Sequence, residues 1–307
     1  MAKVEHSAKG RVGAGIAYAL IGIAFMSVLD TLAKFLGESY GIVQIVFFRN
    51  FFGLLFLLLV LRRSGGFAGL RTRNPLLHGL RAVFALLATF AFFIGLQFMP
   101  LAEAFTLAFV GPIFVTALSV PVLGEAVGRR RWSAVAVGFI GVVMILRPGM
   151  GTFRVEALLP LSAAFGYAMV MLLSRRLSRE ESAIGILFWT AVVGIIVTAL
   201  ALPADWTMPS GRDWALFILL GAAGSLTMYF MTLAYRHAPA AVIAPFDYTI
   251  LLWGLLLGWL IWHELPDPGI WPGAAVLVGC GLYIIHRETR RPAAAPTSVD
   301  SSPPPDK

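Results

Sequence analysis

Long apolar runs alternate with short polar segments along almost the entire chain. A helix needs about 20 predominantly apolar residues to cross the roughly 30 Å hydrocarbon core of a bilayer. Candidate helices of this kind lie near residues 13–36, 41–61, 76–98, 102–123, 132–147, 156–174, 183–202, 213–235, 240–262 and 270–286. The pattern therefore predicts an all-α integral membrane protein with ten transmembrane helices.

The second half of the chain repeats features of the first at an offset of about 139 residues. Trp132 recurs as Trp271, and Glu125 recurs as Glu264, each just before a Gly-rich apolar run. Self-similarity at a fixed offset indicates an internal duplication. The predicted parts are an N-terminal cytoplasmic segment (1–12), a first five-helix repeat (13–149), a second five-helix repeat (150–288) and a disordered cytoplasmic tail (289–307), which is rich in Pro, Ser and Ala.

The distribution of Lys and Arg between the loops predicts the orientation, because these residues are enriched in cytoplasmic loops. With the N-terminus inside, seventeen of them fall in cytoplasmic segments and three, Arg147, Arg154 and Arg212, in the opposite loops. We therefore expect a multi-pass protein of a bacterial-type inner membrane with both termini in the cytoplasm. Because five spans are an odd number, the second half enters the membrane inverted, as in the inverted-topology repeats of secondary transporters.

The composition changes this interpretation little. Apolar residues make up 59% of the chain and charged residues 13%, about half the usual share in soluble domains. A net charge of +8 would favour nucleic-acid binding in a soluble protein, but here the arginines cluster between apolar runs, where membrane orientation explains them. We therefore expect no nucleic-acid partner. Cys280 is the single cysteine, which excludes an intrachain disulfide and a Cys-rich metal site.

Four segments carry a resemblance to a known family. They read LDTLAKFL, QIVFFRNFFGLL, QFMPLAEAFTLAFVGPIFVTALSVPVLGE and APFDYTILLWGLLLGWLIWHE. With the five plus five spans, they make residues 13–288 resemble the drug/metabolite transporter superfamily in its EamA-type branch. The Asp and Lys late in the first span, the Arg in the second and the PFDYT stretch look like those of bacterial riboflavin-type and S-adenosylmethionine-type importers. The resemblance implies a ten-span carrier and favours uptake over export.

Ionisable residues inside the predicted spans mark a candidate site, because a charge at membrane depth costs at least about 2.5 kcal/mol unless it is paired or hydrated. Asp30 and Lys34 are four residues apart, so they share one helix face and are placed to form an ion pair. Alternatively, Lys34 extends outward to the interface. Arg49 lies about 12 Å into the second span, near the midplane. Its predicted partner is Asp30, Glu103, a carbonyl group or a substrate anion.

The ninth span supplies the predicted opposite wall of the site. Asp247 lies about eight residues into this span with no basic residue near it in sequence, so we expect it to take up a proton during transport or to be hydrogen-bonded structurally. Pro245 frees a backbone carbonyl beside it, which favours a position on a cavity. Tyr248 follows Asp247 as a further binding residue. Glu103, in the first turn of the fourth span, is either a helix-capping carboxylate or a gating residue.

Three further features have structural interpretations. His78 and Arg81 lie near the cytoplasmic edge of the third span and are predicted to anchor it among lipid headgroups. Gly254 and Gly258 form a GxxxG pattern, which allows close helix contact either inside the protein or across a dimer interface. Cys280 is expected to pack within the last helix.

Enzyme and channel interpretations find little support in the sequence. The chain lacks the GxxxxGK[ST], HExxH and GxSxG patterns, so we expect neither an ATP-driven pump nor an enzyme, and no cofactor or metal. A membrane-embedded transferase is the main rival class, with Asp30, Glu103 and Asp247 as acid and base. These residues lie singly on different spans without a metal-ligand cluster. A channel would need a repeated filter sequence or a ring of charges.

The sequence therefore predicts a secondary transporter that moves a small polar or heterocyclic solute by alternating access through a central cavity between the halves. The candidate binding or gating residues are Asp30, Lys34, Arg49, Glu103, Asp247 and Tyr248. On the resemblance, the solute is a vitamin or nucleoside-like compound such as riboflavin or S-adenosylmethionine, and export of an amino acid, drug or metallophore is the alternative. The expected partners are the solute and membrane lipid. Proton coupling and proton-independent exchange both stay open, as do a monomer and a homodimer.

Overall fold

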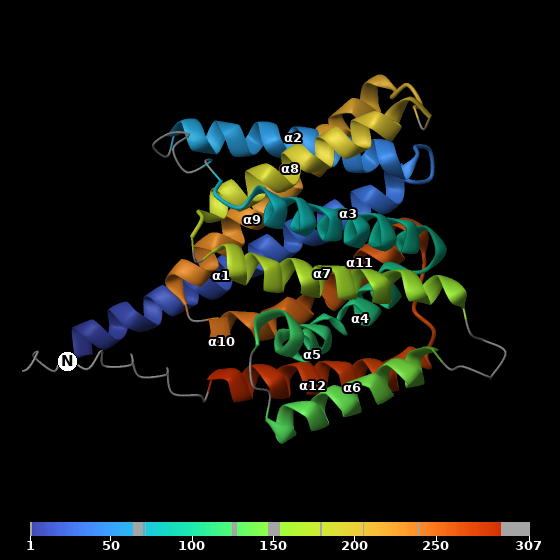
Figure 1. Ribbon diagram of the computed structural model, residues 1–307. Coiled ribbons are helices and arrows are strands. Elements are labelled where there is room, and N and C mark those ends of the chain that lie inside the picture. Colours follow the sequence, from blue (N-terminus) through green and yellow to red (C-terminus); the bar gives the residue numbers. More distant parts are fainter. Residues whose placement is uncertain are drawn as a thin grey trace, which may run out of the picture.

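The computed structural model describes residues 2–63, 70, 72–124, 128–146, 154–178, 180–204, 206–238 and 240–289. This part of the chain is helical and forms one elongated bundle (Figure 1). The α-helices are α1 (Ala2–Leu36), α2 (Ile42–Arg63), α3 (Pro75–Phe98), α4 (Leu101–Ala108), α5 (Gly111–Leu123), α6 (Arg129–Leu146), α7 (Leu158–Leu177), α8 (Ala183–Ala201), α9 (Gly211–His237), α10 (Ala240–Ile243), α11 (Ile250–Trp262) and α12 (Ile270–Thr289). Short 3-10 segments are η2 (Val155–Ala157), η3 (Leu202–Ala204) and η4 (Ala244–Thr249).

The helices confirm a membrane protein with many spans. Within the described residues, eight helical segments are long and apolar enough to cross a bilayer, and two shorter apolar helices cover Trp132–Leu146 and Ile270–Tyr283. Helices occupy all ten predicted regions, but α1 begins at Ala2 instead of residue 13. A helix can continue into polar sequence beyond its apolar run, because its backbone hydrogen bonds need no bilayer. The predicted Glu125 loop and the tail from residue 290 lie outside the described residues.

Two spans are broken in the middle. The region 101–123 divides into α4 and α5 just before Gly111-Pro112, and the region 240–262 divides into α10, η4 and α11 around Pro245. Proline has no N–H to donate, so a helix at this point loses one backbone hydrogen bond and kinks or restarts. The predicted irregularity at Pro245 is therefore present, and it places Asp247 and Tyr248 in a 3-10 segment.

Each half of the chain packs mainly against the other half. α1 lies along α9, and α3 lies along α7. In both pairs, a helix of the first half packs against a helix of the second half. α2 contacts α8, α4 contacts α11, and α6 lies beside α12 at one edge of the bundle (Figure 1). α1 begins and α12 ends at the same end of the bundle (Figure 1). We call this end the His78 end, because α3 also begins there, and the opposite end the Lys34 end.

Close packing holds these helices together, because between apolar helices in lipid the hydrophobic effect supplies little attraction. The ring of Phe48 on α2 lies 4.7 Å, centroid to centroid, from the ring of Phe217 on α9. A Cβ atom at Gly254 on α11 would lie 2.6 Å from the Cδ2 atom of Phe105 on α4. Gly254, from the GxxxG pattern, therefore makes an internal helix contact. Cys280 is buried in α12, as expected.

Candidate functional site

A buried lysine joins the two halves at one end of the bundle. Lys34, only 5% exposed, places its ammonium 2.5 Å from Oε2 of Glu264 and donates a hydrogen bond of 3.0 Å to the carbonyl of Met99. The same ammonium lies 4.9 Å from the ring centroid of Trp262, within cation–π range. The hypothesis of an ion pair between Lys34 and Asp30 is therefore wrong. The long lysine side chain instead crosses to the loop between α11 and α12.

Two further hydrogen bonds hold the same loop region. Glu103 on α4 accepts a hydrogen bond of 3.1 Å from the backbone N–H of Asp267. The indole of Trp262 donates one of 2.5 Å to Glu38, which follows α1. We call the set of Lys34, Glu264, Glu103 and Asp267 the Lys34 latch. It fastens α1 and α4 of the first half to the α11–α12 connection of the second.

Asp30 on α1 and Arg49 on α2 interact electrostatically without an ion pair among the described residues, and Arg49 also contacts α3. Asp30 is 3% exposed, and its Oδ2 atom is buried without a hydrogen-bond partner among the described residues. It interacts electrostatically with Arg49, which is one of the partners predicted for that arginine. Arg49 donates a hydrogen bond of 3.0 Å to the hydroxyl of Thr89 and lies 5.6 Å from the ring centroid of Phe93. A buried acceptor oxygen without a partner among the described residues and a half-buried guanidinium thus lie within electrostatic range of each other.

The opposite end has a latch of different chemistry, built around one glutamate. Glu181, in the α7–α8 connection, bonds the buried His78 and accepts a hydrogen bond of 2.7 Å from the hydroxyl of Thr72. The backbone N–H groups of Arg73 and Asn74 donate to the same carboxylate at 3.0 and 3.2 Å. Burial raises the pKa of Glu181, but the bonds from His78, Thr72 and these N–H groups outweigh it and lower the pKa to about 2. Together these residues form the His78 latch.

Arg81 turns into the bundle instead of toward the headgroups. It is 7% exposed, its Nε donates a hydrogen bond of 2.7 Å to Ser174 on α7, and its Nη1 donates to Thr190 on α8. His78, 3% exposed, is likewise buried against Glu181. The prediction that both residues anchor α3 among headgroups is therefore wrong. The sequence does not tell which face of a helix meets a neighbouring helix.

The two residues predicted from the ninth span have different surroundings. Asp247 interacts electrostatically with Tyr167 on α7 and Tyr235 on α9. The ring of Tyr248 packs 4.5 Å, centroid to centroid, from Phe109, and its hydroxyl is buried with no hydrogen-bond partner in the described part of the chain. Asp247 thus belongs to a group of tyrosines between helices of both halves, whereas Tyr248 is packed as an aromatic side chain with one unsatisfied oxygen.

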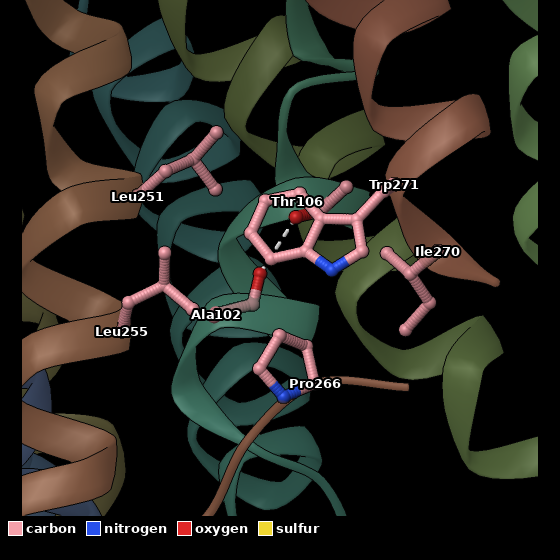
Figure 2. A pocket seen from close by; sticks show the side chains of 7 residues that line it. All are labelled: Ala102, Thr106, Leu251, Leu255, Pro266, Ile270 and Trp271. Atoms are coloured by element: carbon pink, nitrogen blue, oxygen red, sulfur yellow. Dashed lines mark hydrogen bonds between the residues drawn. The ribbon is translucent and has the colours of Figure 1, made fainter. Parts of the chain in front are cut away.

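A small pocket at the Lys34 end does not coincide with these polar groups. Figure 2 shows that its lining is almost entirely apolar, and the one hydroxyl, that of Thr106, donates to the carbonyl of Ala102 at 2.7 Å. The lining residues are Ala102, Thr106, Leu251, Leu255, Pro266, Ile270 and Trp271. The pocket therefore offers packing surface but no polar recognition. It lies beside the Lys34 latch, whose loop supplies Pro266.

Comparison with known families and proteins gives consistent matches over most of the chain. The family model described as the EamA-like transporter family matches residues 13–147 and again residues 154–287. A solved protein crystal structure aligns with a TM-score of 0.60 at 20% identity, covering 90% of this chain and 99% of the other. At that identity the structural likeness shows the fold alone.

Three similar proteins of known name are two uptake or vitamin transporters and one exporter. An S-adenosylmethionine uptake transporter of Rickettsia prowazekii is 30% identical, covering 90% of this chain and 94% of its own. A riboflavin transporter of Rhizobium johnstonii is 35% identical, covering 89% and 90%. A pseudopaline exporter of Pseudomonas aeruginosa is 30% identical, covering 87% and 94%. Similar chains thus include both importers and an exporter.

Proposed function

The chain belongs to the EamA-like transporter family, and from this premise we propose that it is an inner-membrane secondary transporter that takes up a small metabolite by alternating access. The observation that carries the proposal is the buried Asp30, which keeps one carboxylate oxygen without a partner among the described residues and interacts electrostatically with the half-buried Arg49. Charged groups are costly inside a membrane and usually mark a substrate or ion pathway.

The proposed architecture is ten spans in two inverted five-helix repeats, with residues 13–149 and 150–288 as the units. Support comes from the family model, which matches twice, and from the pairing of α1 with α9 and of α3 with α7. The broken spans also lie at the same offset in the two halves. The distribution of Lys and Arg supports an orientation with both termini in the cytoplasm. In that orientation the Lys34 end faces outward.

In this mechanism the two latches are the gates. The Lys34 latch, including Glu103, closes the outer end, and the His78 latch ties the inner ends of α3, α7 and α8. Alternating access requires that contacts between the halves break at one end while those at the other hold, so that rocking exposes a fixed central site to each side in turn. Asp247 and Tyr248 contribute the wall opposite Asp30 and Arg49 in this proposal. Uptake of a proton by Asp247 would couple transport to a gradient.

The proposed solutes are riboflavin and S-adenosylmethionine, which the named relatives carry. A guanidinium beside a carboxylate suits a solute that presents a hydrogen-bond acceptor next to a donor. The imide edge of riboflavin has this arrangement, and so do the carboxylate and ammonium groups of S-adenosylmethionine. Export of a metallophore or a related amino-acid derivative is the second candidate, because the pseudopaline exporter is 30% identical.

The test is uptake of labelled riboflavin and labelled S-adenosylmethionine into cells auxotrophic for each compound. Wild type is compared with Arg49→Ala and Asp247→Asn, and the amount of each protein in the membrane is measured. Uptake by the wild type that collapses in Arg49→Ala supports both the function and the site. If the wild type takes up neither compound, uptake is refuted for both, and efflux from cells preloaded with the same compounds tests the exporter alternative.

A further inference from the structure

Arg81 is a buried cation that lacks a carboxylate partner in the described part of the chain. The ion pairs found there join Lys34 to Glu264 and His78 to Glu181. Arg81 instead bonds the hydroxyls of Ser174 and Thr190. A buried charge without an opposite charge is unfavourable, because neutral dipoles replace only part of its lost hydration. The arrangement is therefore costly unless an anion or water reaches the guanidinium.

The two hydroxyls hold Arg81 in a fixed orientation. Each hydroxyl donates its own proton to a backbone carbonyl one turn earlier, Ser174 to Val170 and Thr190 to Ile186 at 2.7 Å. Their lone pairs are thus directed at Arg81. A guanidinium has five N–H donors, and the bonds from Nε and Nη1 use two of them. The remaining donors have no acceptor among the described residues and are held in place for an oxygen ligand.

The surroundings of Arg81 include an accessible aromatic residue from another helix. Tyr167 on α7 interacts electrostatically with both Arg81 and Asp247 and is 55% exposed. Arg81 also lies on the same helix as Thr89, the partner of Arg49, eight residues away and therefore about 12 Å along the axis. Arg81 belongs to α3, and Arg49 of α2 bonds the same helix about two turns farther along, so the two guanidinium groups lie at different positions along α3.

We propose that Arg81 is a second solute-binding residue, which receives a carboxylate or carbonyl oxygen of the solute in the half of the pathway nearer the His78 end. Ser174 and Thr190 position the guanidinium, and Tyr167 borders the space in which the solute oxygen binds. The inference rests on the proposed transport function and extends it, since it gives the solute two successive cationic contacts. It also restricts the solute class to compounds that carry a carboxylate or a strong carbonyl acceptor.

The test measures the local charge and water access at this site without needing a known substrate. Cys280 is the only cysteine, so Cys280→Ala gives a cysteine-free background. Tyr167→Cys then places one thiol beside Arg81, and Trp206→Cys, in a connection at the Lys34 end where Trp206 is 44% exposed, serves as the control. Each full-length protein, in detergent, reacts with an anionic sulfonatoethyl and a cationic trimethylammonioethyl methanethiosulfonate. The readout is the ratio of the anionic to the cationic rate.

We expect Arg81→Gln to lower this ratio at position 167 by about threefold or more, and Arg81→Lys to preserve it, because the lysine keeps the charge. Asp247→Asn should raise the ratio, because it removes the opposing negative charge. The ratio at position 206 should stay constant. Two outcomes would overturn the proposal and indicate a structural arginine without access to water. One is a thiol at position 167 that reacts with neither reagent, and the other is the same ratio in the protein with Arg81, in Arg81→Lys and in Arg81→Gln.

A second measurement keeps the proposal falsifiable if Arg81→Gln does not fold. In the protein that retains Arg81, raising the salt from about 10 mM to about 1 M should reduce the preference for the anionic reagent at 167, because the Debye length falls from about 30 to 3 Å. A preference that is absent at low salt refutes the proposal. No step of this test measures transport. Failure of the uptake assay would therefore count against the proposed function, and failure here against Arg81 alone.

Discussion

Arg49 and Arg81 are two arginines at membrane depth with different electrostatic surroundings. Arg49 bonds one hydroxyl, that of Thr89, and faces the carboxylate of Asp30. Arg81 bonds two hydroxyls, those of Ser174 and Thr190, and has no carboxylate partner among the described residues. Arg49 therefore has a carboxylate of the protein near enough to interact with its charge, whereas Arg81 depends on water or a solute. In the protein without solute, we expect the charge of Arg49, but not that of Arg81, to be partly balanced by a carboxylate.

The largest expected effect is on transport through Arg49. Arg49→Ala removes the cation opposite Asp30, and we expect initial uptake to fall at least about tenfold, which corresponds to the loss of one charged contact. Arg49→Lys keeps the charge but not the planar fork, so it should retain part of the activity. Uptake rates normalised to membrane protein check this. Full activity of Arg49→Ala would remove Arg49 from the site.

The second prediction concerns stability and tests whether Asp30 neutralises Arg49. Asp30→Asn removes the carboxylate that interacts electrostatically with the half-buried Arg49, so it should lower the free energy of unfolding. The double variant Asp30→Asn with Arg49→Gln should recover a large part of this loss, because both charges are then absent. Thermal unfolding in detergent measures the coupling in a double-mutant cycle. Simple additivity of the two substitutions would contradict the pairing. The same Asp30→Asn change should not affect the labelling ratio at position 167.

The third prediction concerns the Lys34 latch. Its ion pair joins the two halves of the chain, whereas Asp30 and Arg49 both belong to the first half. Lys34→Glu places two carboxylates together and should reduce uptake several-fold by disturbing closure at that end. The charge exchange Lys34→Glu with Glu264→Lys should restore part of the activity, since it restores an opposite pair. Uptake assays on the two single variants and the double variant check this. No recovery in the double variant would mean that the latch is not held by charge.

The smallest expected effect is that of Glu181→Gln on thermal stability. Unlike Arg81, Glu181 has hydrogen-bond partners in both side chains and backbone N–H groups. Its lowered pKa of about 2 means that the folded protein favours the ionised carboxylate. The resulting stabilisation is fully present above the ordinary pKa of a glutamate and disappears as the pH falls toward 2. Glu181→Gln should therefore lower Tm by about 2–6 °C at pH 6 and by less at pH 3. A pH-independent difference in Tm would contradict the role of the ionised form.

The amino-acid sequence was sufficient to predict the helices. Apolar runs locate helices because the bilayer fixes their length and forces backbone hydrogen bonding within each segment. The helices lie where the runs predict them, and the break at Pro245 follows from the missing N–H of proline. The sequence also identified Asp30, Arg49, Glu103 and Asp247 as unusual, since a charged residue inside a long apolar run can be recognised without a structure.

Only the tertiary structure decided which of these groups meet. Lys34 and Asp30 share a helix face, yet Lys34 bonds Glu264, 230 residues away in sequence. Arg81 looked like a surface anchor, yet helix rotation and the neighbours α7 and α8 bury it. Apolar residues cover nearly every face of these helices, so periodicity does not show which side meets protein and which meets lipid. The sequence therefore determined where the helices lie along the chain, while helix packing determined which charged and polar side chains meet.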